Sequence, residues 1–196
     1  MTEQKNENEC RGTILVNGEI DRDLAGNVSV AIGAWTDRFE AEFVPIKDRV
    51  ITLYIVDCPG GSVSAGMAIL GAMDRARQFG VKFRTISAGL VASMAVVIAA
   101  YGDKGQRCAL RYTEYLMHQP MGAASGQATD IVIAAQHISK LRSRLYRILA
   151  QCTGQSSERI AKDCDRDYII TADDAVIYGL CDEAYNSGAK KAKQDK

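Results

Sequence analysis

The stretch RVITLYIVDCPGGSVSAGMAIL, residues 49–70, decides the fold of this 196-residue chain. Residues 49–57 are rich in β-branched side chains and predict a strand. The CPGGS sequence that follows is a strong turn signal. From residue 64 to residue 80, Met67, Leu70 and Met73 recur at helical spacing. A strand, a tight turn and a helix in this order form the repeating unit of an α/β protein.

The same alternation continues on both sides of this stretch. The other predicted elements are a strand at 12–20, a helix at 23–36, a strand at 81–89, a helix opened by Ser93, a strand at 113–120 and a helix at 127–151. A long connection separates the first helix from the strand at 49. We find no internal repeat and no linker, which predicts one α/β domain over residues 13–187.

Both ends of the chain are polar. Residues 1–12 contain only Met1 and Cys10 as apolar groups, and so predict a disordered segment. The Lys-rich residues 188–196 predict a solvated, disordered tail.

The charge and cysteine content exclude several classes of protein. Lys+Arg and Asp+Glu both count 24, so no basic surface suggests a nucleic-acid partner. The six cysteines form no C-x-x-C pair, and only two histidines are present to help build a metal site. We therefore predict no metal, and reduced thiols in a cytoplasmic setting. No apolar run reaches the roughly 18 residues that span a bilayer, so no membrane contact is predicted.

The predicted helix at 127–151 is long for a chain of this size. Its apolar residues follow one seam, with Gly154 as the stop signal: Ile131, Ala134, Ile138, Leu141, Leu145, Ile148 and Cys152. About 25 residues at roughly 1.5 Å each give a rod near 38 Å. Such a rod extends beyond a small domain, so the seam predicts contact with another subunit and a homo-oligomer. The alternative is a helix packed flat on its own sheet.

Ser93 stands among apolar residues where a predicted strand meets a helix. A serine there can be an N-cap, or it can be a nucleophile exposed beside the free N–H groups of the helix. Val91 and Ala95 stand where the G-x-S-x-G elbow would have glycines, so that motif is absent. The residues alone leave both readings of Ser93 open.

A serine nucleophile needs a base, an acid that orients the base, and amides for the oxyanion. His118 ends a strand at a sheet edge and is the better base candidate, because His137 lies within the long helix. The acid is left open among five candidates: Asp163, Asp165, Asp167, Asp173 and Asp174. Asp174 has a competing role, since Thr171 and Asp174 fit a variant capping box.

The oxyanion donors are equally open at this stage. Gly60 and Gly61 follow a strand and could direct backbone N–H groups into the same cleft. A plain β-to-α turn is the alternative reading of this glycine pair.

Four segments together carry a specific resemblance. CPGGSVSAGMAIL (58–70), GLVASMA (89–95), YLMHQPMGAASGQATDI (115–131) and DRDYIITADDAVIYGLCDEAY (165–185) resemble, in order and spacing, the signature segments of the ClpP family. The members of this family are the proteolytic subunits of ATP-dependent Clp proteases. The resemblance runs from about Ile14 to Tyr185.

The resemblance implies a role for each matching residue. Ser93 would be the nucleophile, His118 the general base and Asp167 the residue that orients His118. The amides of Gly61 and Met94 would form the oxyanion hole. The activity implied is that of a serine endopeptidase acting on peptides and unfolded proteins.

The resemblance also implies the fold and the partners. The fold would be the spiral of ββα units shared with crotonases, with the long helix as a projecting handle between two stacked heptameric rings. An AAA+ unfoldase would use ATP and feed the chamber, so this chain itself would need no cofactor. The short polar N-terminus departs from the family pattern and puts the identity of that unfoldase in doubt.

Two rival functions share these features in part. A crotonase-like acyl-CoA enzyme would have the fold and two oxyanion amides, without a need for Ser93, His118 and Asp167 together. A catalytically inactive ring-forming subunit would have lost at least one of the three. The presence of all three favours the peptidase.

Overall fold

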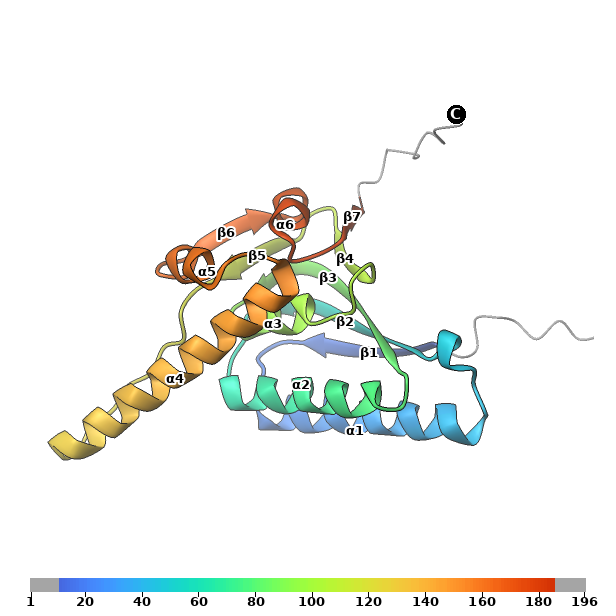
Figure 1. The fold of residues 1–196 in the computed structure, drawn as a ribbon, viewed down its shortest axis with the longest axis horizontal. Coiled ribbons are helices and arrows are strands. Elements are labelled where there is room, and N and C mark those ends of the chain that lie inside the picture. The colour runs from blue at the N-terminus through green and yellow to red at the C-terminus, as the bar shows by residue number, and fades with distance from the viewer. Residues whose placement is uncertain (1–10, 186–196) are drawn as a thin grey trace, which may run out of the picture.

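The computed structural model describes residues 11–185 and shows a mixed α/β protein (Figure 1). The strands are β1 (Arg11–Asn17), β2 (Val50–Cys58), β3 (Lys82–Ala92), β4 (Arg107–Leu110), β5 (Glu114–Met117), β6 (Tyr168–Thr171) and β7 (Glu183–Tyr185). The helices are α1 (Arg22–Ala41), α2 (Val63–Arg77), α3 (Met94–Ala100), α4 (Ala128–Thr153), α5 (Ser157–Asp163) and α6 (Ala172–Tyr178), with a short 3-10 helix η1 (Ile46–Asp48). The predicted α/β class is confirmed.

The strands form one sheet, in which β1, β2, β3, β4 and β7 lie side by side and parallel. The long strand β3 has two successive neighbours on one side. Its residues Thr85–Ser87 pair with β4, and its residues Leu90–Ala92 pair with β5. Strand β6 then pairs antiparallel with β5. The end of β3 therefore lies next to the β5–β6 pair. Strands β5 and β6 are neighbours in the sheet although α4 and α5 separate them in the sequence.

One face of the parallel sheet forms the core. Ile51, Leu53 and Ile55 alternate along β2 and are fully buried, as alternation in a strand predicts. Helices α1 and α2 lie side by side on one side of the sheet (Figure 1), and residues of α1, α2 and α3 join the same buried cluster. The opposite face is more open, since Leu15 on β1 is 57% exposed.

The N-terminal boundary and the first helix differ from the prediction. Strand β1 begins at Arg11, which pairs with Val50, so residues 11 and 12 belong to a strand and not to the segment predicted to be disordered. Helix α1 continues to Ala41, because Thr36 and Phe39 extend its buried face through what was predicted as a connection. The remaining predictions for residues 1–10 and for the tail at 188–196 lie outside the described residues.

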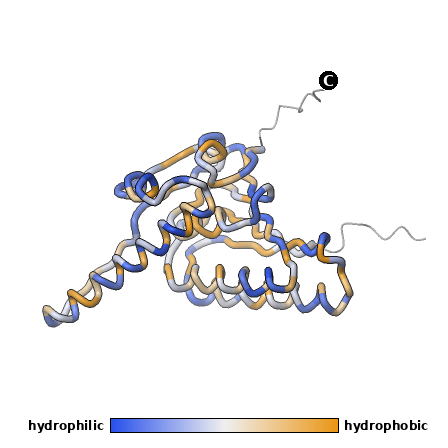
Figure 2. The backbone as a smooth tube through the Cα atoms, in the orientation of Figure 1, coloured by the Kyte–Doolittle hydropathy of each residue, from blue (hydrophilic) through white to orange (hydrophobic). Residues whose placement is uncertain are grey.

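Helix α4 projects from the body of the molecule (Figure 1). Gly154, with φ 80°, provides the left-handed C-cap. Only the final third packs on the core, where Leu145, Tyr146 and Leu149 are buried. Along the projecting part, apolar and polar positions are interspersed (Figure 2). There Ile131 is 43% exposed in the single subunit.

An ion pair between a buried arginine and a partly buried aspartate ties the C-terminal elements to the sheet. Arg107, at the start of β4, has a side chain that is 4% exposed and bonds Asp182 through Nη2 (2.5 Å) and Nε (3.0 Å). Its Nη1 also donates to the carbonyls of Cys152 and Gly179, both at 2.9 Å. One side chain therefore connects the ends of α4 and α6 with the approach to β7.

No helix between residues 11 and 185 is long and apolar enough to cross a membrane.

Candidate active site

Ser93 occupies a strained turn between β3 and α3. Its backbone has φ 53° and ψ −122°, a left-handed conformation that costs a non-glycine residue about 1–3 kcal/mol. The turn is held by the Ser93 N–H, which donates to the carbonyl of Leu116 on β5 at 2.8 Å. The side chain makes no capping hydrogen bond to α3. Ser93 thus stands at the N-cap position of α3 without a side-chain capping bond, and its hydroxyl is available for another role.

His118 and Asp167 are brought together by the pairing of β5 with β6. Met117 on β5 pairs with Tyr168 on β6 in the antiparallel register. His118 follows Met117 and Asp167 precedes Tyr168, so the two side chains extend from the next position of the ladder. His118 Nδ1 and Asp167 Oδ1 are 3.5 Å apart, longer than a tight hydrogen bond. The His118 side chain is 20% exposed and that of Asp167 is 69% exposed.

The other acidic candidates have different surroundings. Asp163 accepts hydrogen bonds from Arg159 Nε at 2.6 Å and from the Tyr178 hydroxyl at 2.9 Å. Asp174 belongs to the predicted capping box: its N–H donates to Thr171 Oγ1 at 3.3 Å, and the Thr171 hydroxyl donates to its carboxylate at 2.8 Å. Within the described residues, Asp167 is the only carboxylate in an ion-pair contact with His118.

The Gly60–Gly61 turn lies against the Ser93 turn. A Cβ atom on Gly60 would stand 2.7 Å from both the Ala92 carbonyl oxygen and Ser93 Cβ, and 3.0 Å from Met94 N. Gly61 has φ 141°, and its own Cβ would collide with the Ile20 carbonyl at 2.5 Å. Only glycine allows this approach. The turn thus places backbone of the β2–α2 connection beside the first amide of α3.

A small apolar cavity of ≈ 20 Å³ opens beside Ser93 and His118. Its other lining residues are Met94, Val96, Val97, Met117, Pro120, Leu145, Tyr146, Leu149 and Cys164. Burial raises the pKa of the Cys164 thiol to about 11, so at neutral pH it is an uncharged part of this wall. The contribution of α4 to this cavity could not be predicted from the sequence, where the apolar seam of the helix indicated contact with another subunit.

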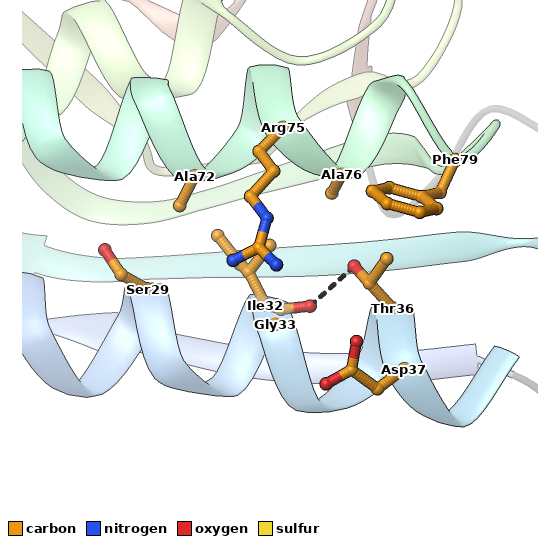
Figure 3. Close-up of a pocket in the computed structure, with 9 residues that line it drawn as sticks. All are labelled: Ser29, Ile32, Gly33, Thr36, Asp37, Ala72, Arg75, Ala76 and Phe79. Atoms are coloured by element: carbon orange, nitrogen blue, oxygen red, sulfur yellow. Dashed lines mark hydrogen bonds between the residues drawn. The ribbon is translucent and has the colours of Figure 1, made fainter. Parts of the chain in front are cut away.

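A second cavity lies between α1 and α2 (Figure 3). It holds ≈ 30 Å³, and the Thr36 hydroxyl beside it donates to the Ile32 carbonyl at 2.8 Å. Arg75 reaches across from α2 toward α1. None of Ser93, His118 and Asp167 lines it, so it is not part of the candidate active site.

Residues 11–185 contain no cluster of three or more His, Cys, Asp or Glu side chains that could hold a metal ion.

Gly60→Ala tests the close approach of the two turns. The added methyl group has to displace either the glycine turn or the Ser93 turn, because its nearest neighbours include backbone atoms. For the peptidase that the resemblance implies, we expect hydrolysis to fall by about 10²–10³, the scale of losing one oxyanion donor. Gly71→Ala on α2 is the matched control, since nothing lies within 4 Å of its added Cβ. The control should keep its activity; equal activity in both variants would contradict the prediction.

Comparison with known proteins first identifies the class. A family model described as Clp protease matches residues 11–188. The chain belongs to the Clp protease family. It is similar to the ATP-dependent Clp protease proteolytic subunit of Ligilactobacillus salivarius (strain UCC118), with 46% identity over 169 residues that cover 86% of this chain and 80% of the relative. Membership of this family implies a serine peptidase, and the resemblance noted from the four sequence segments is confirmed.

Proposed function

We propose that the protein is a serine endopeptidase in which Ser93 is the nucleophile, His118 the general base and Asp167 the residue that orients His118. One observation supports this most strongly: Ser93 and His118 line one cavity, and the imidazole of His118 faces Asp167 at 3.5 Å. The uncapped Ser93 hydroxyl and its strained turn fit the same role.

The reaction follows from these positions. His118 takes the proton of the Ser93 hydroxyl as its oxygen attacks the scissile carbonyl, and later gives that proton to the leaving amine. The carboxylate of Asp167 stabilises the imidazolium that forms in between. Water then attacks the acyl-enzyme by the same route, with His118 again as the base, and Ser93 is restored.

The oxyanion would be held by the amides of Gly61 and Met94. Met94 is the first residue of α3, so its N–H has no partner within the helix. Gly61 belongs to the turn that lies against Ser93. Two amides from separate elements can thus converge on the carbonyl oxygen as negative charge develops there.

The lining of the cavity supports a preference for an apolar side chain on the acyl side of the cleaved bond. Most of the lining residues are apolar, Met94, Val97, Leu145 and Leu149 among them, and none is an aspartate, glutamate, lysine or arginine. A charged side chain would lose its hydration there without gaining a partner.

A fluorophosphonate probe tests the proposed function directly. The probe should attach to Ser93 in the intact protein, and mass spectrometry of the labelled peptide should locate it there. A folded protein that stays unlabelled would instead support an inactive ring-forming subunit or a crotonase-like enzyme. Labelling at a different serine would also contradict the assignment.

The particle we propose is two stacked heptameric rings that enclose a chamber, supplied by an AAA+ unfoldase. The relative's printed name, a proteolytic subunit of an ATP-dependent protease, supports a partner ATPase. The exposed apolar residues of the projecting part of α4, including Ile131, support contact between subunits. ATP would then be consumed by the partner, with no cofactor bound to this chain.

Ile131→Asp tests the contact made by α4. Leu145, although on the same seam, is a poor choice because it is buried in its own subunit and lines the active-site cavity. Burying an unpaired carboxylate at residue 131 costs several kcal/mol. We expect the variant to sediment as single rings or smaller species with reduced hydrolysis.

The control for this variant is Ser143→Asp. Ser143 is exposed and lies on the opposite side of α4 from the seam, twelve residues from Ile131. It should sediment as the wild type does. An Ile131→Asp particle that also sediments unchanged would contradict the proposed role of α4.

A further inference from the structure

A polar pocket of ≈ 330 Å³ lies far from Ser93 along the strands, where the parallel strands begin. Its lining residues lie at or near the end of the sheet where the strands begin: Lys47, Val50, Thr52, Lys82, Arg84, Gly105, Gln106, Cys108 and Glu183. Val50 pairs with Lys82, and Cys108 pairs with Glu183, so the starts of β2, β3, β4 and β7 all contribute. Ser93 follows the opposite, carboxyl end of β3. The pocket is thus separate from the active site.

Positive charge predominates in this pocket. It is lined by Lys47, Lys82 and Arg84 against the carboxylate of Glu183. Within residues 11–185, neither lysine has an ion-pair partner. Arg84 donates a hydrogen bond to the Tyr185 hydroxyl at 2.6 Å. Because this hydroxyl is neutral, the contact does not compensate the positive charge of Arg84. A pocket with this charge is suited to an anionic ligand.

The spacing of the cations favours an extended acidic peptide. Lys82 and Arg84 are two residues apart on β3, so their Cα atoms are separated by about 6.6 Å along the strand. Carboxylates two residues apart in an extended peptide have the same repeat. None of the lining residues is aromatic, so a nucleotide base would find no stacking surface among them.

The chain itself contains such a peptide next to this pocket. Residues 1–10, MTEQKNENEC, include Glu7 and Glu9 at that spacing. They immediately precede Arg11, which pairs with Val50, itself paired with Lys82. Two strand spacings of roughly 4.8 Å separate Arg11 from Lys82 across the sheet. Two residues of chain span up to about 7 Å, so Glu9 with its side chain reaches that distance.

We propose that the pocket binds the acidic N-terminal segment of the same chain, with Glu7 and Glu9 paired to Lys82, Arg84 and Lys47. The segment has little apolar surface for packing, so charge is what holds it. Exposed ion pairs are individually weak and are screened by salt. Covalent attachment to β1 compensates for this weakness, since it raises the effective concentration of the segment to the millimolar range. The contact is therefore a salt-sensitive latch.

Zero-length carbodiimide cross-linking of the full-length protein tests this proposal. The reagent joins a carboxylate to an amine only where the two are in contact, and mass spectrometry identifies the joined peptides. We expect cross-links from Glu7 or Glu9 to Lys82 or Lys47, and at least fivefold fewer to the exposed control Lys140 on α4. The yield at Lys82 should fall several-fold in 1 M NaCl. Equal yields at Lys82 and Lys140 would overturn the proposal.

Two further arms make the result specific. Glu7→Gln with Glu9→Gln should abolish the cross-links without disturbing the fold, because both positions precede β1. Exchanging the charges, with Glu9→Lys and Lys82→Glu together, should restore a cross-link between residues 9 and 82 that neither single variant gives. Particles assembled from mixed ¹⁵N-labelled and unlabelled chains should show joined peptides of one isotope only. Mixed-isotope pairs would overturn the assignment to the same chain.

Discussion

Ser93→Ala is expected to reduce peptide hydrolysis by a factor on the order of 10⁶ while leaving the fold intact, the scale seen when a triad nucleophile is removed. The side chain makes no capping bond to α3, so its loss removes no hydrogen bond that holds the helix. His118→Ala should cost about as much. Asp167→Asn should cost less, on the order of 10⁴, because His118 can still act as a base when poorly oriented. Steady-state cleavage of a fluorogenic peptide measures all three.

Ser93→Gly separates catalysis from strain. Both substitutions remove the hydroxyl, so both variants should be equally inactive. Glycine tolerates φ 53° without strain, whereas alanine does not. The glycine variant should therefore unfold at a higher urea concentration than the alanine variant, by roughly 1 kcal/mol in free energy of unfolding. Substantial hydrolysis by either variant would show that another residue is the nucleophile.

Arg107→Met is expected to lower the free energy of unfolding by about 3 kcal/mol, the low end of the cost of removing one partner from a buried ion pair, because Asp182 is partly exposed. The change leaves the Asp182 carboxylate without its main partner and removes the donor to the carbonyls of Cys152 and Gly179. For a domain of this size the midpoint of thermal unfolding should fall by roughly 10 °C. Circular dichroism during heating or urea titration would measure the change.

Two variants control for this interpretation. Arg75→Met changes an exposed arginine on α2, and should shift stability by no more than about 0.5 kcal/mol. Asp182→Leu combined with Arg107→Met removes both charges, and should recover part of the loss because no unpaired carboxylate remains. An Arg107→Met protein as stable as the Arg75→Met control would mean that the ion pair contributes little.

The elements of the fold could be predicted because periodicity is a local property of the sequence. The strand at 49–57 and the helix at 64–80 lie within a few residues of β2 and α2. The end of α1 was missed, since its last turns contain few apolar residues besides Trp35 and Phe39. Where a helix has a narrow buried face, its amino-acid composition resembles that of a loop. Tertiary contacts then determine where the helix ends.

The candidate site was predictable only in part from the residues themselves. Ser93 and His118 could be picked out by position, but the aspartates of residues 163–174 could not be ranked by spacing. The antiparallel pairing of β5 with β6 decides which aspartate lies beside His118, and the pairing partner of a strand is not a local property. The cationic pocket was missed for the same reason, because Lys47, Lys82 and Arg84 come together only through the sheet.

The pairing of β7 with β4 has a consequence for the order of folding during synthesis. Strands β1, β2 and β3 are neighbours in both sequence and space, so their pairing can begin early. Arg107, by contrast, meets Asp182 across 75 positions of sequence. Until the ribosome has released the residues of β7, the edge of β4 has no paired strand. The guanidinium of Arg107 also lacks its Asp182 partner until then. The nascent chain therefore passes through a stage in which an unpaired strand edge is exposed, the kind of surface on which aggregation begins.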